Sequence, residues 1–283
     1  MNAYMNDAPF INSIFHPSDF SDASENAFGH ALAIALRRKC KFTILHAGKS
    51  KDAWTDFPAI RSTLERWGML KAGSSKSAVG NELNVQIQKV AIDTDEPVES
   101  ILDYLERHPT DLIVLATEGR DGLPRWIKPS IAEKVAEASH TMTLFVPSSV
   151  HGFVRFEDGR ILLRKILVPV DFNPSPRPAV TYAARAAGLT NESVEIILLN
   201  IGDGSIYRTL ETEENPGIGW EKLHREGNIV EEITKVARDR DVDLIVMTTE
   251  GRKGFLDALR GSITQQVLRT VPCPLLAVPV QKI

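Results

Sequence analysis

The chain has 283 residues, of which 43% are hydrophobic and 25% are charged, and its formal net charge is −4. This length accommodates two domains of ordinary size, and the composition can supply a buried core, which excludes a largely disordered chain. The weakly negative charge, without a long run of Lys or Arg, argues against a nucleic-acid-binding protein.

The N-terminus and the cysteines indicate the compartment. Residues 1–7 have neither a basic start nor an apolar run, so we expect no signal peptide. No segment approaches the roughly 18 apolar residues that span a bilayer. Cys40 and Cys273 lie in apolar surroundings beside predicted strands, and two cysteines make no disulfide framework. We therefore expect buried free thiols in a cytoplasmic protein without membrane contacts.

The chain repeats itself in two regions that follow in the same order. Residues 111–130 and 243–262 align without a gap and are identical at half of their positions. A strand that ends in Pro-x-Asp-Phe also occurs twice, at 17–20 and at 169–172. The offsets of the two matches differ, which leaves about twenty extra residues in the first copy between His46 and Glu96.

Each copy alternates strands with helices. The second copy is expected to have strands at 165–170, 194–201, 220–225, 244–248 and 275–280, and helices at 178–188, 229–240 and 264–270. The first copy follows the same order, with one added helix near residues 60–70. This pattern predicts an α/β protein with two tandem doubly wound parallel-sheet domains. In such sheets a ligand binds in a crevice at the carboxyl ends of the strands, where the strand order switches.

The join between the copies has the pattern of a hairpin. Residues 153–163 carry apolar positions on both sides of Asp158-Gly159, a pair that favours a tight turn. We therefore divide the chain into a first domain, residues 1–150, and a second domain, residues 151–283.

Two features of the second copy could hold an anionic ligand. Gly251 opens a loop after the fourth strand, and Gly261-Ser262 precede the last helix. Backbone N–H groups at a helix N-terminus, with glycines and a serine hydroxyl beside them, can form a phosphate site. The same residues can also make turns and cap the helix. Asp171, after the first strand, can accept from a ribose hydroxyl or an adenine amino group, or cap the next helix.

Together these residues resemble the universal stress protein family. The resemblance covers both copies and rests on residues 166–171, 243–247 and 271–279 and on the spacing from Gly251 to Gly261-Ser262. It implies a universal stress protein fold of the adenine nucleotide alpha hydrolase-like type, with strand order 3-2-1-4-5. It also implies a stress-response module that binds ATP, with or without Mg²⁺. The residues that it assigns to the nucleotide are Pro169, Val170, Asp171, Ile201, Thr248, Gly251, Gly261 and Ser262.

Departures from the family pattern set the two copies apart. Thr248 stands where the family has its first glycine, and a β-branched side chain there could crowd a nucleotide. In the first copy this position is Ala116, and Pro129 replaces the third glycine and removes an N–H from the anion cradle. We therefore expect nucleotide binding mainly in the second copy, and a degenerate site in the first.

Other polar residues give no catalytic assignment. His16 and His46 could line the crevice of the first copy, but a structural role is the simpler interpretation, since the seven histidines show no metal-ligand spacing. Glu118 and Glu250 precede matching glycines and could bind a metal with a phosphate, or be solvated loop residues.

Three functions stay open. The first is a regulatory module that binds an adenine nucleotide and has protein partners still to be identified. The family resemblance implies that its domains pair through their last strands, 144–147 against 275–279, while association of two chains into a homodimer stays open. The second is a slow ATP hydrolase, which the lack of a positioned base disfavours. The third is a partner-binding protein without any nucleotide.

Overall fold

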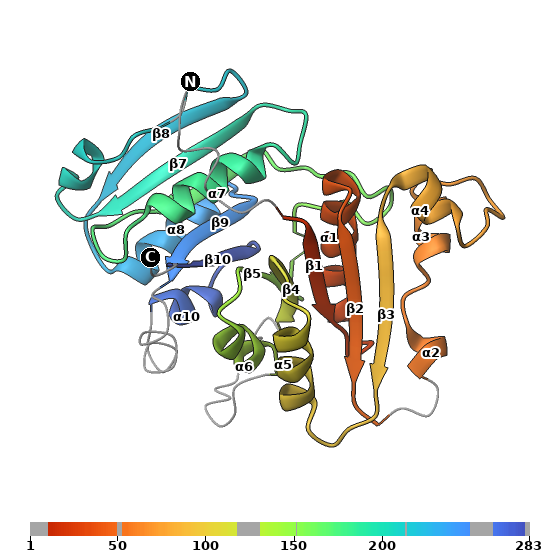
Figure 1. The fold of residues 1–283 in the computed structure, drawn as a ribbon. Coiled ribbons are helices and arrows are strands. Elements are labelled where there is room, and N and C mark those ends of the chain that lie inside the picture. The colour runs from red at the N-terminus through yellow and green to blue at the C-terminus, as the bar shows by residue number, and fades with distance from the viewer. Residues whose placement is uncertain are drawn as a thin grey trace.

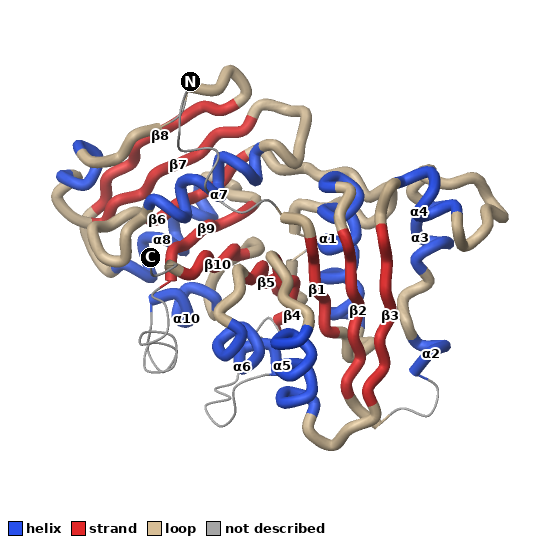
Figure 2. Tube along the Cα trace, viewed as in Figure 1, coloured by secondary structure: helices blue, strands red, loops and turns tan. Residues whose placement is uncertain are grey.

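The structure, a computed structural model, describes residues 11–49, 53–117, 131–150, 152–212, 214–249 and 263–280. In this part of the chain, strands from both halves join into one ten-stranded sheet (Figure 1). Helices lie over both faces of the sheet (Figure 2).

The strands of the first half are β1 (Ser13–Pro17), β2 (Lys41–Ala47), β3 (Gln86–Ile92), β4 (Leu112–Thr117) and β5 (Thr143–Pro147). Those of the second half are β6 (Lys165–Pro169), β7 (Val194–Ile201), β8 (Ile218–Arg225), β9 (Leu244–Thr249) and β10 (Leu275–Pro279). The bounds of β6 to β10 agree with those expected for the second copy to within two residues at either end. The largest difference is at the start of β8.

The helices of the first half are α1 (Asp22–Arg38), α2 (Ala53–Asp56), α3 (Ile60–Arg66), α4 (Ala78–Leu83), α5 (Pro97–Arg107) and α6 (Ile131–Ser139). Those of the second half are α7 (Arg177–Ala187), the 3₁₀-helix η2 (Ser205–Arg208), α8 (Ile229–Asp239) and α10 (Ile263–Leu268). The predicted extra helix corresponds to α3, whereas α2 and α4 were not expected.

The sheet order is β3-β2-β1-β4-β5-β10-β9-β6-β7-β8, so each half has the predicted order 3-2-1-4-5. All neighbours within a half are parallel. The two halves meet through β5 and β10, which are antiparallel with Leu144 opposite Leu276. The expected pairing of the last strands is therefore confirmed.

The core lies in two layers because side chains alternate between the faces of each strand. Ile14 packs on the face covered by α1 and α7, and its neighbour Phe15 packs on the face covered by α5, α6, α8 and α10. Both side chains are about 1% exposed. Since α1 comes from the first half and α7 from the second, one continuous apolar layer links the two halves.

The extra residues of the first copy connect β2 to β3. This connection spans residues 48–85 and contains α2, α3 and α4, whereas residues 202–217 connect β7 to β8. Trp67, which follows α3, donates from its indole Nε1 to the carbonyl of Phe156 at 2.8 Å. The guanidinium of Arg66 lies 4.5 Å from the centre of the Phe156 ring. The connection between β2 and β3, which we call the inserted segment, therefore packs against the join between the two halves.

The join itself is a hairpin, as predicted, with Val154 and Ile161 bridged antiparallel. The division of the chain at residue 151 stays a prediction.

Both cysteines are buried and unpaired, as expected. Burial raises the pKa of Cys40 to about 11 and that of Cys273 to about 12, so both thiols stay protonated and unreactive near neutral pH. Among the described residues, no helix has both the length and the apolar character to cross a membrane.

Candidate functional site

The predicted site lies where the strand order of the second half switches. The chain leaves β6 toward β7 and β8 and then returns to pair β9 with the other side of β6. The carboxyl ends of β6, β7 and β9 therefore form one edge of the sheet, which we call the second-half edge. Ligands of open α/β sheets bind at such a position.

The structure brings together the predicted site residues that it describes. Pro169 ends β6, Ile201 ends β7, and Thr248 lies near the end of β9. Val170 is 3% exposed, and its N–H donates to the Leu199 carbonyl at 2.8 Å. Asp171 follows it and is exposed. Gly251, Gly261 and Ser262 lie outside the described residues, as do Glu118, Pro129 and Glu250.

The carboxylate of Asp171 does not cap the helix that follows. The N-cap of α7 is Pro176, and Asp171 Oδ1 instead accepts from the N–H of Phe172 at 2.7 Å. Within the described residues, Oδ2 receives no hydrogen bond. The ring of Phe172 is 58% exposed beside it. The second-half edge thus presents an exposed carboxylate next to an exposed aromatic ring.

Thr248, which replaces the expected glycine, has a structural partner. Its hydroxyl accepts from the N–H of Ala179 at 3.3 Å, and its side chain is buried. Ala179 lies in the first turn of α7, where N–H groups have no partner within the helix. Because Pro176 offers no side-chain cap, Thr248 supplies one from β9. This contact fixes the start of α7 to the sheet.

Asn200 is a further residue of this edge, which sequence reasoning missed. Its side chain is 4% exposed, and its Nδ2 donates to the Val170 carbonyl at 2.9 Å. Its Oδ1 accepts from the N–H of Gly204 at 2.9 Å. The amide thereby joins the end of β6 to the loop after β7, so it sets the relative position of Val170 and Ile201. An amide at the end of an apolar strand was the available signal.

Tyr207, in η2, completes this network. Its hydroxyl accepts from the N–H of Asn200 at 2.9 Å and lies 3.0 Å from the carbonyl of Leu198 and 2.5 Å from that of Leu223. Burial raises the pKa of Tyr207, so the phenol keeps the proton that it donates. The loop after β7 is therefore anchored to both β7 and β8.

The equivalent edge of the first half is covered by aromatic side chains. The registers place His46 at the position of Asn200 and Ser18 at that of Val170, and His46 Nδ1 likewise donates to the Ser18 carbonyl at 2.8 Å. Phe20 stacks on His46 with 4.2 Å between ring centroids and meets the edge of Phe57 at 5.3 Å. We call Phe20, His46 and Phe57 the aromatic cluster. Phe57 comes from the inserted segment and is 4% exposed.

A family model for the universal stress protein family matches residues 12–147 and 203–279, which is most of the chain. This chain belongs to that family. The first matched segment covers β1 to β5 and the second covers β8 to β10, so each half contains a match to the family and the predicted duplication is confirmed.

Known relatives match either nearly the whole chain or a part of it. One from Mycobacterium tuberculosis is 21% identical over 265 residues, which cover 86% of this chain and 88% of that protein. One from Methanothermobacter thermautotrophicus is 43% identical over 61 residues, only 21% of this chain and 40% of that protein. The crystal structure of one from Archaeoglobus fulgidus superposes with a TM-score of 0.62 at 18% identity, over 95% of this chain and 98% of that one. This last likeness shows a common fold.

His16, in the first half of this universal stress protein, has a structural role. His16 is fully buried, with Nδ1 2.9 Å from the Val114 carbonyl and Nε2 3.2 Å from Ser24 Oγ. Burial lowers the pKa of His16 to about 4, so the ring is neutral near pH 7 and Nε2 accepts from the serine. In the described ranges, no group of three or more His, Cys, Asp or Glu side chains could hold a metal.

Proposed function

We propose that this universal stress protein is a regulatory module that binds an adenine nucleotide, ATP in the first instance, at the second-half edge. The observation that carries the proposal is the difference between the two equivalent edges. Asp171 and Phe172 are exposed at the second, whereas Phe57 covers the first. A ligand at the first-half edge would have to displace a buried ring.

The roles of the residues follow from their chemistry. The Asp171 carboxylate would accept from the hydroxyl groups of a ribose, a charge-assisted bond of the stronger kind. The backbone of Ile201, positioned by the Asn200 network, would lie beside the adenine. Gly251, Gly261 and Ser262 would hold the phosphates with backbone N–H groups and a hydroxyl, and Mg²⁺ would accompany the triphosphate.

Calorimetric titration of ATP with Mg²⁺ into the nucleotide-stripped full chain tests this proposal. We expect about one ATP per chain. Asp171→Ala should weaken binding tenfold or more, because a hydrogen bond to a charged group contributes about 1.5–3 kcal/mol. Gly261→Pro, which copies Pro129 of the first half, should weaken it as well.

The matched control is Asp19→Ala, which changes the equivalent carboxylate of the first half. Asp19 Oδ1 accepts from the hydroxyl of Ser21 at 2.6 Å and from its N–H at 3.1 Å, so Asp19 serves the start of α1. This variant should bind ATP as the parent does. Absence of ATP binding by the parent, or equal effects of Asp19→Ala and Asp171→Ala, would overturn the proposal.

A nucleotide-free, partner-binding protein is the second candidate. It is favoured by the structural contact of Thr248 with α7, because that contact gives a reason for the loss of the family glycine without any ligand. In that case ATP should neither bind nor raise the melting temperature. Turnover of labelled ATP that Asp171→Ala abolishes would instead favour a slow hydrolase. As part of the nucleotide-module proposal, we also propose that the protein is cytoplasmic and that two chains associate into a homodimer.

A further inference from the structure

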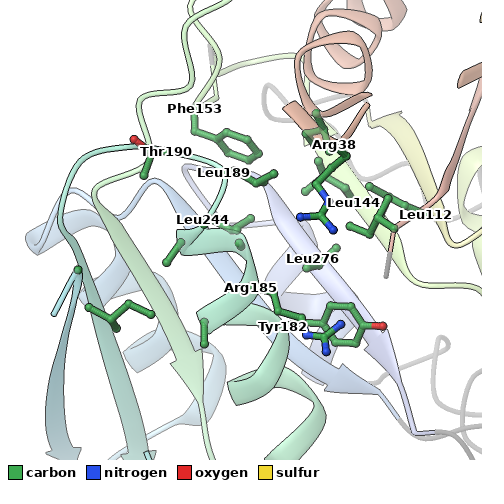
Figure 3. A pocket seen from close by; sticks show the side chains of 18 of the residues that line it. Arg38, Leu112, Leu144, Phe153, Tyr182, Arg185, Leu189, Thr190, Leu244 and Leu276 are labelled. Atoms are coloured by element: carbon green, nitrogen blue, oxygen red, sulfur yellow. The ribbon is translucent and has the colours of Figure 1, made fainter. Parts of the chain in front are cut away.

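A cavity of about 430 Å³ lies between the two halves, on the face of the sheet that α1 and α7 cover. Its floor is formed by buried leucines from four strands, namely Leu112, Leu144, Leu244 and Leu276. Figure 3 shows these side chains, with Phe153 from the join beside them. A volume of this size falls in the range of roughly 300–1,000 Å³ that is usual for small-molecule sites.

The cavity is separate from the second-half edge. Leu112, Leu244 and Ile218, which line it, are the first residues of β4, β9 and β8, so it lies toward the amino ends of these strands. Asp171 and Thr248, at the carboxyl ends, do not line it. A ligand here would therefore not occupy the nucleotide position.

Both halves build this cavity. Ile34 and Arg38 come from α1, whereas Tyr182 and Ala184 come from α7. The antiparallel pairing of β5 with β10 brings these helices together over one floor. A single copy of the domain would supply only one of the two helical walls, so the cavity depends on the duplication.

The charged and phenolic side chains beside the floor are already engaged within the protein. The guanidinium of Arg185 lies 5.8 Å from the centre of the Tyr182 ring, close enough for a cation–π interaction. The negative charge of the Asp111 carboxylate also acts on Tyr182. Arg38, which reaches the floor from α1 (Figure 3), has an interaction of its own. These residues therefore offer a ligand no free ionic partner.

The side chains at the rim of the cavity are engaged as well. Asn191 and Glu192 are exposed, which places the mouth of the cavity beside them. Asn191 Oδ1 accepts from the guanidinium of Arg37 at 2.8 Å. Glu192 Oε1 lies 3.7 Å from the guanidinium of Arg160, which is outside the described lining. The charge of Glu192 is therefore already paired.

The two remaining polar side chains, Thr190 and Asn215, accept from backbone N–H groups at 3.2 and 3.0 Å. All seven polar side chains that the structure describes in the lining thus have an interaction already. A charged group that enters the cavity loses its hydration and gains no free partner, which costs free energy. An uncharged apolar body avoids this cost, and it displaces water that finds few polar partners over the leucines.

We propose that this cavity is a second binding site, which takes an uncharged molecule with an apolar body and a small neutral head such as a hydroxyl group. The body lies over the leucine floor. The head lies at the rim, where Asn191 and Asn215 are exposed. Because the ligand contacts both halves, its binding stabilises their association.

Titration calorimetry of butan-1-ol, hexan-1-ol and octan-1-ol into the full chain tests the site. We expect one site, with an affinity that rises about fourfold for each added methylene group, because each one buries more apolar surface. Octanoate and octylammonium share the chain of octan-1-ol but carry opposite charges, and both should bind more weakly by roughly tenfold or more. Saturating ATP should leave octan-1-ol binding unchanged, which separates this site from the proposed nucleotide site.

Two variants assign the binding to the cavity. Ala184→Phe adds a ring from a half-buried lining position of α7 and should weaken octan-1-ol binding by roughly tenfold or more, because the ring covers the floor. The control is Thr181→Phe, which adds the same ring about one helical turn away, at a half-buried position outside the described lining. This control should bind octan-1-ol as the parent does.

The segment of residues 1–10 is the competing occupant of the cavity, because Ile11 lines it. Removal of residues 1–10 should leave octan-1-ol binding unchanged if the cavity takes a free ligand. Octan-1-ol binding that appears only after this truncation would overturn the proposal in favour of the segment.

Tighter binding of longer alcohols, preference for octan-1-ol over both charged probes and loss of binding in Ala184→Phe alone support the site. Failure of octan-1-ol to bind the parent, equal or tighter binding of a charged probe, or equal effects of the two phenylalanine variants would contradict it. The comparison of probes needs only the parent chain, so the proposal stays testable if Ala184→Phe does not fold.

Discussion

In the first half Phe20 packs against His46 and Phe57, whereas in the second half the equivalent Phe172 is 58% exposed. Both rings follow the same Pro-x-Asp motif at the end of the same strand. The difference comes from the segment between β2 and β3, which supplies Phe57 and is longer than the connection between β7 and β8, residues 202–217. The same duplicated motif therefore places its phenylalanine in a packed aromatic cluster in the first copy and on an exposed edge in the second.

The starts of α1 and α7 show the same divergence. Ser21 caps α1 locally, since its side chain accepts from the N–H of Ser24. The N-cap of α7 is Pro176, and its support comes from Thr248 across the sheet. The first half therefore needs no polar side chain at Ala116, the position equivalent to Thr248. Each half stabilises the same helix terminus with residues from a different element.

The largest expected effect is the loss of Phe57. Phe57→Ala should lower the free energy of unfolding by about 3–5 kcal/mol, because it removes a buried ring and leaves a cavity at the first-half edge. Urea unfolding measures this change. The control is Trp54→Ala, since Trp54 contacts Phe57 but is 66% exposed, and it should cost much less. Equal costs would contradict the covering role of Phe57.

The second-largest expected effect on stability concerns the contact between the inserted segment and the join. Gly159 has φ +69°, and a Cβ at this position would lie 2.3 Å from Cε3 of Trp67. Gly159→Ala should therefore cost about 2–4 kcal/mol, from backbone strain together with displacement of the indole. Urea unfolding again provides the measurement.

Gly68→Ala is a matched control for this change. Gly68 has φ +70°, but a Cβ there would meet nothing within 4 Å. Only the backbone strain remains, about 1 kcal/mol. The difference between the two variants measures the contact of Trp67 with the join. If both alanine variants lose the same stability, the inserted segment does not hold the hairpin.

The pattern of strands could be predicted because buried parallel strands are short apolar runs, which local sequence reveals. The pairing of 144–147 with 275–279, which the structure confirms, was implied by the family resemblance and not by any local sequence pattern. Helices α2 and α4 escaped prediction, since elements of four and six residues carry too little periodicity. The aromatic cluster could not be predicted because Phe20 and Phe57 meet only through the insertion.

The position of the candidate site residues in the fold could also be predicted in part, because it follows from the pattern of strands. Asp171, Ile201 and Thr248 end predicted strands, and parallel strands bring their carboxyl ends together. The partners of these residues were not predictable, because they depend on register. Asn200 reaches Val170, and Thr248 reaches Ala179, across 30 and 69 residues of sequence. Only the folded sheet makes such pairs neighbours.

Acid sensitivity should differ between the halves, since His16 occupies the position of Val168. Burial lowers the folded-state pKa of His16 to about 4, from 6.5 in an exposed side chain. The unfolded chain therefore takes up a proton as the pH falls below about 6.5, and the folded chain does not until about 4. This linkage removes stability over that window, on the order of 2 kcal/mol by pH 5.

The test compares unfolding free energies at pH 7 and pH 5. His16→Val, which adopts the residue of the second half, should show a smaller loss than the parent by roughly that 2 kcal/mol. His30, also buried with its pKa lowered to about 4, is present in both proteins and cancels. An unchanged dependence in His16→Val would show that His16 is not the acid-sensitive group.

The smallest effect tests whether Thr248 stabilises α7. Thr248→Val keeps the shape of the side chain but leaves the Ala179 N–H without its acceptor, which should cost about 1–2 kcal/mol in urea unfolding. Thr249→Val is the control, because Thr249 is equally buried and its hydroxyl makes no hydrogen bond among the described residues. If Thr249→Val costs as much, the loss reflects the strand and not the helix terminus. A larger loss in Thr248→Val alone would give a structural reason for a threonine at the position where the resemblance predicts glycine.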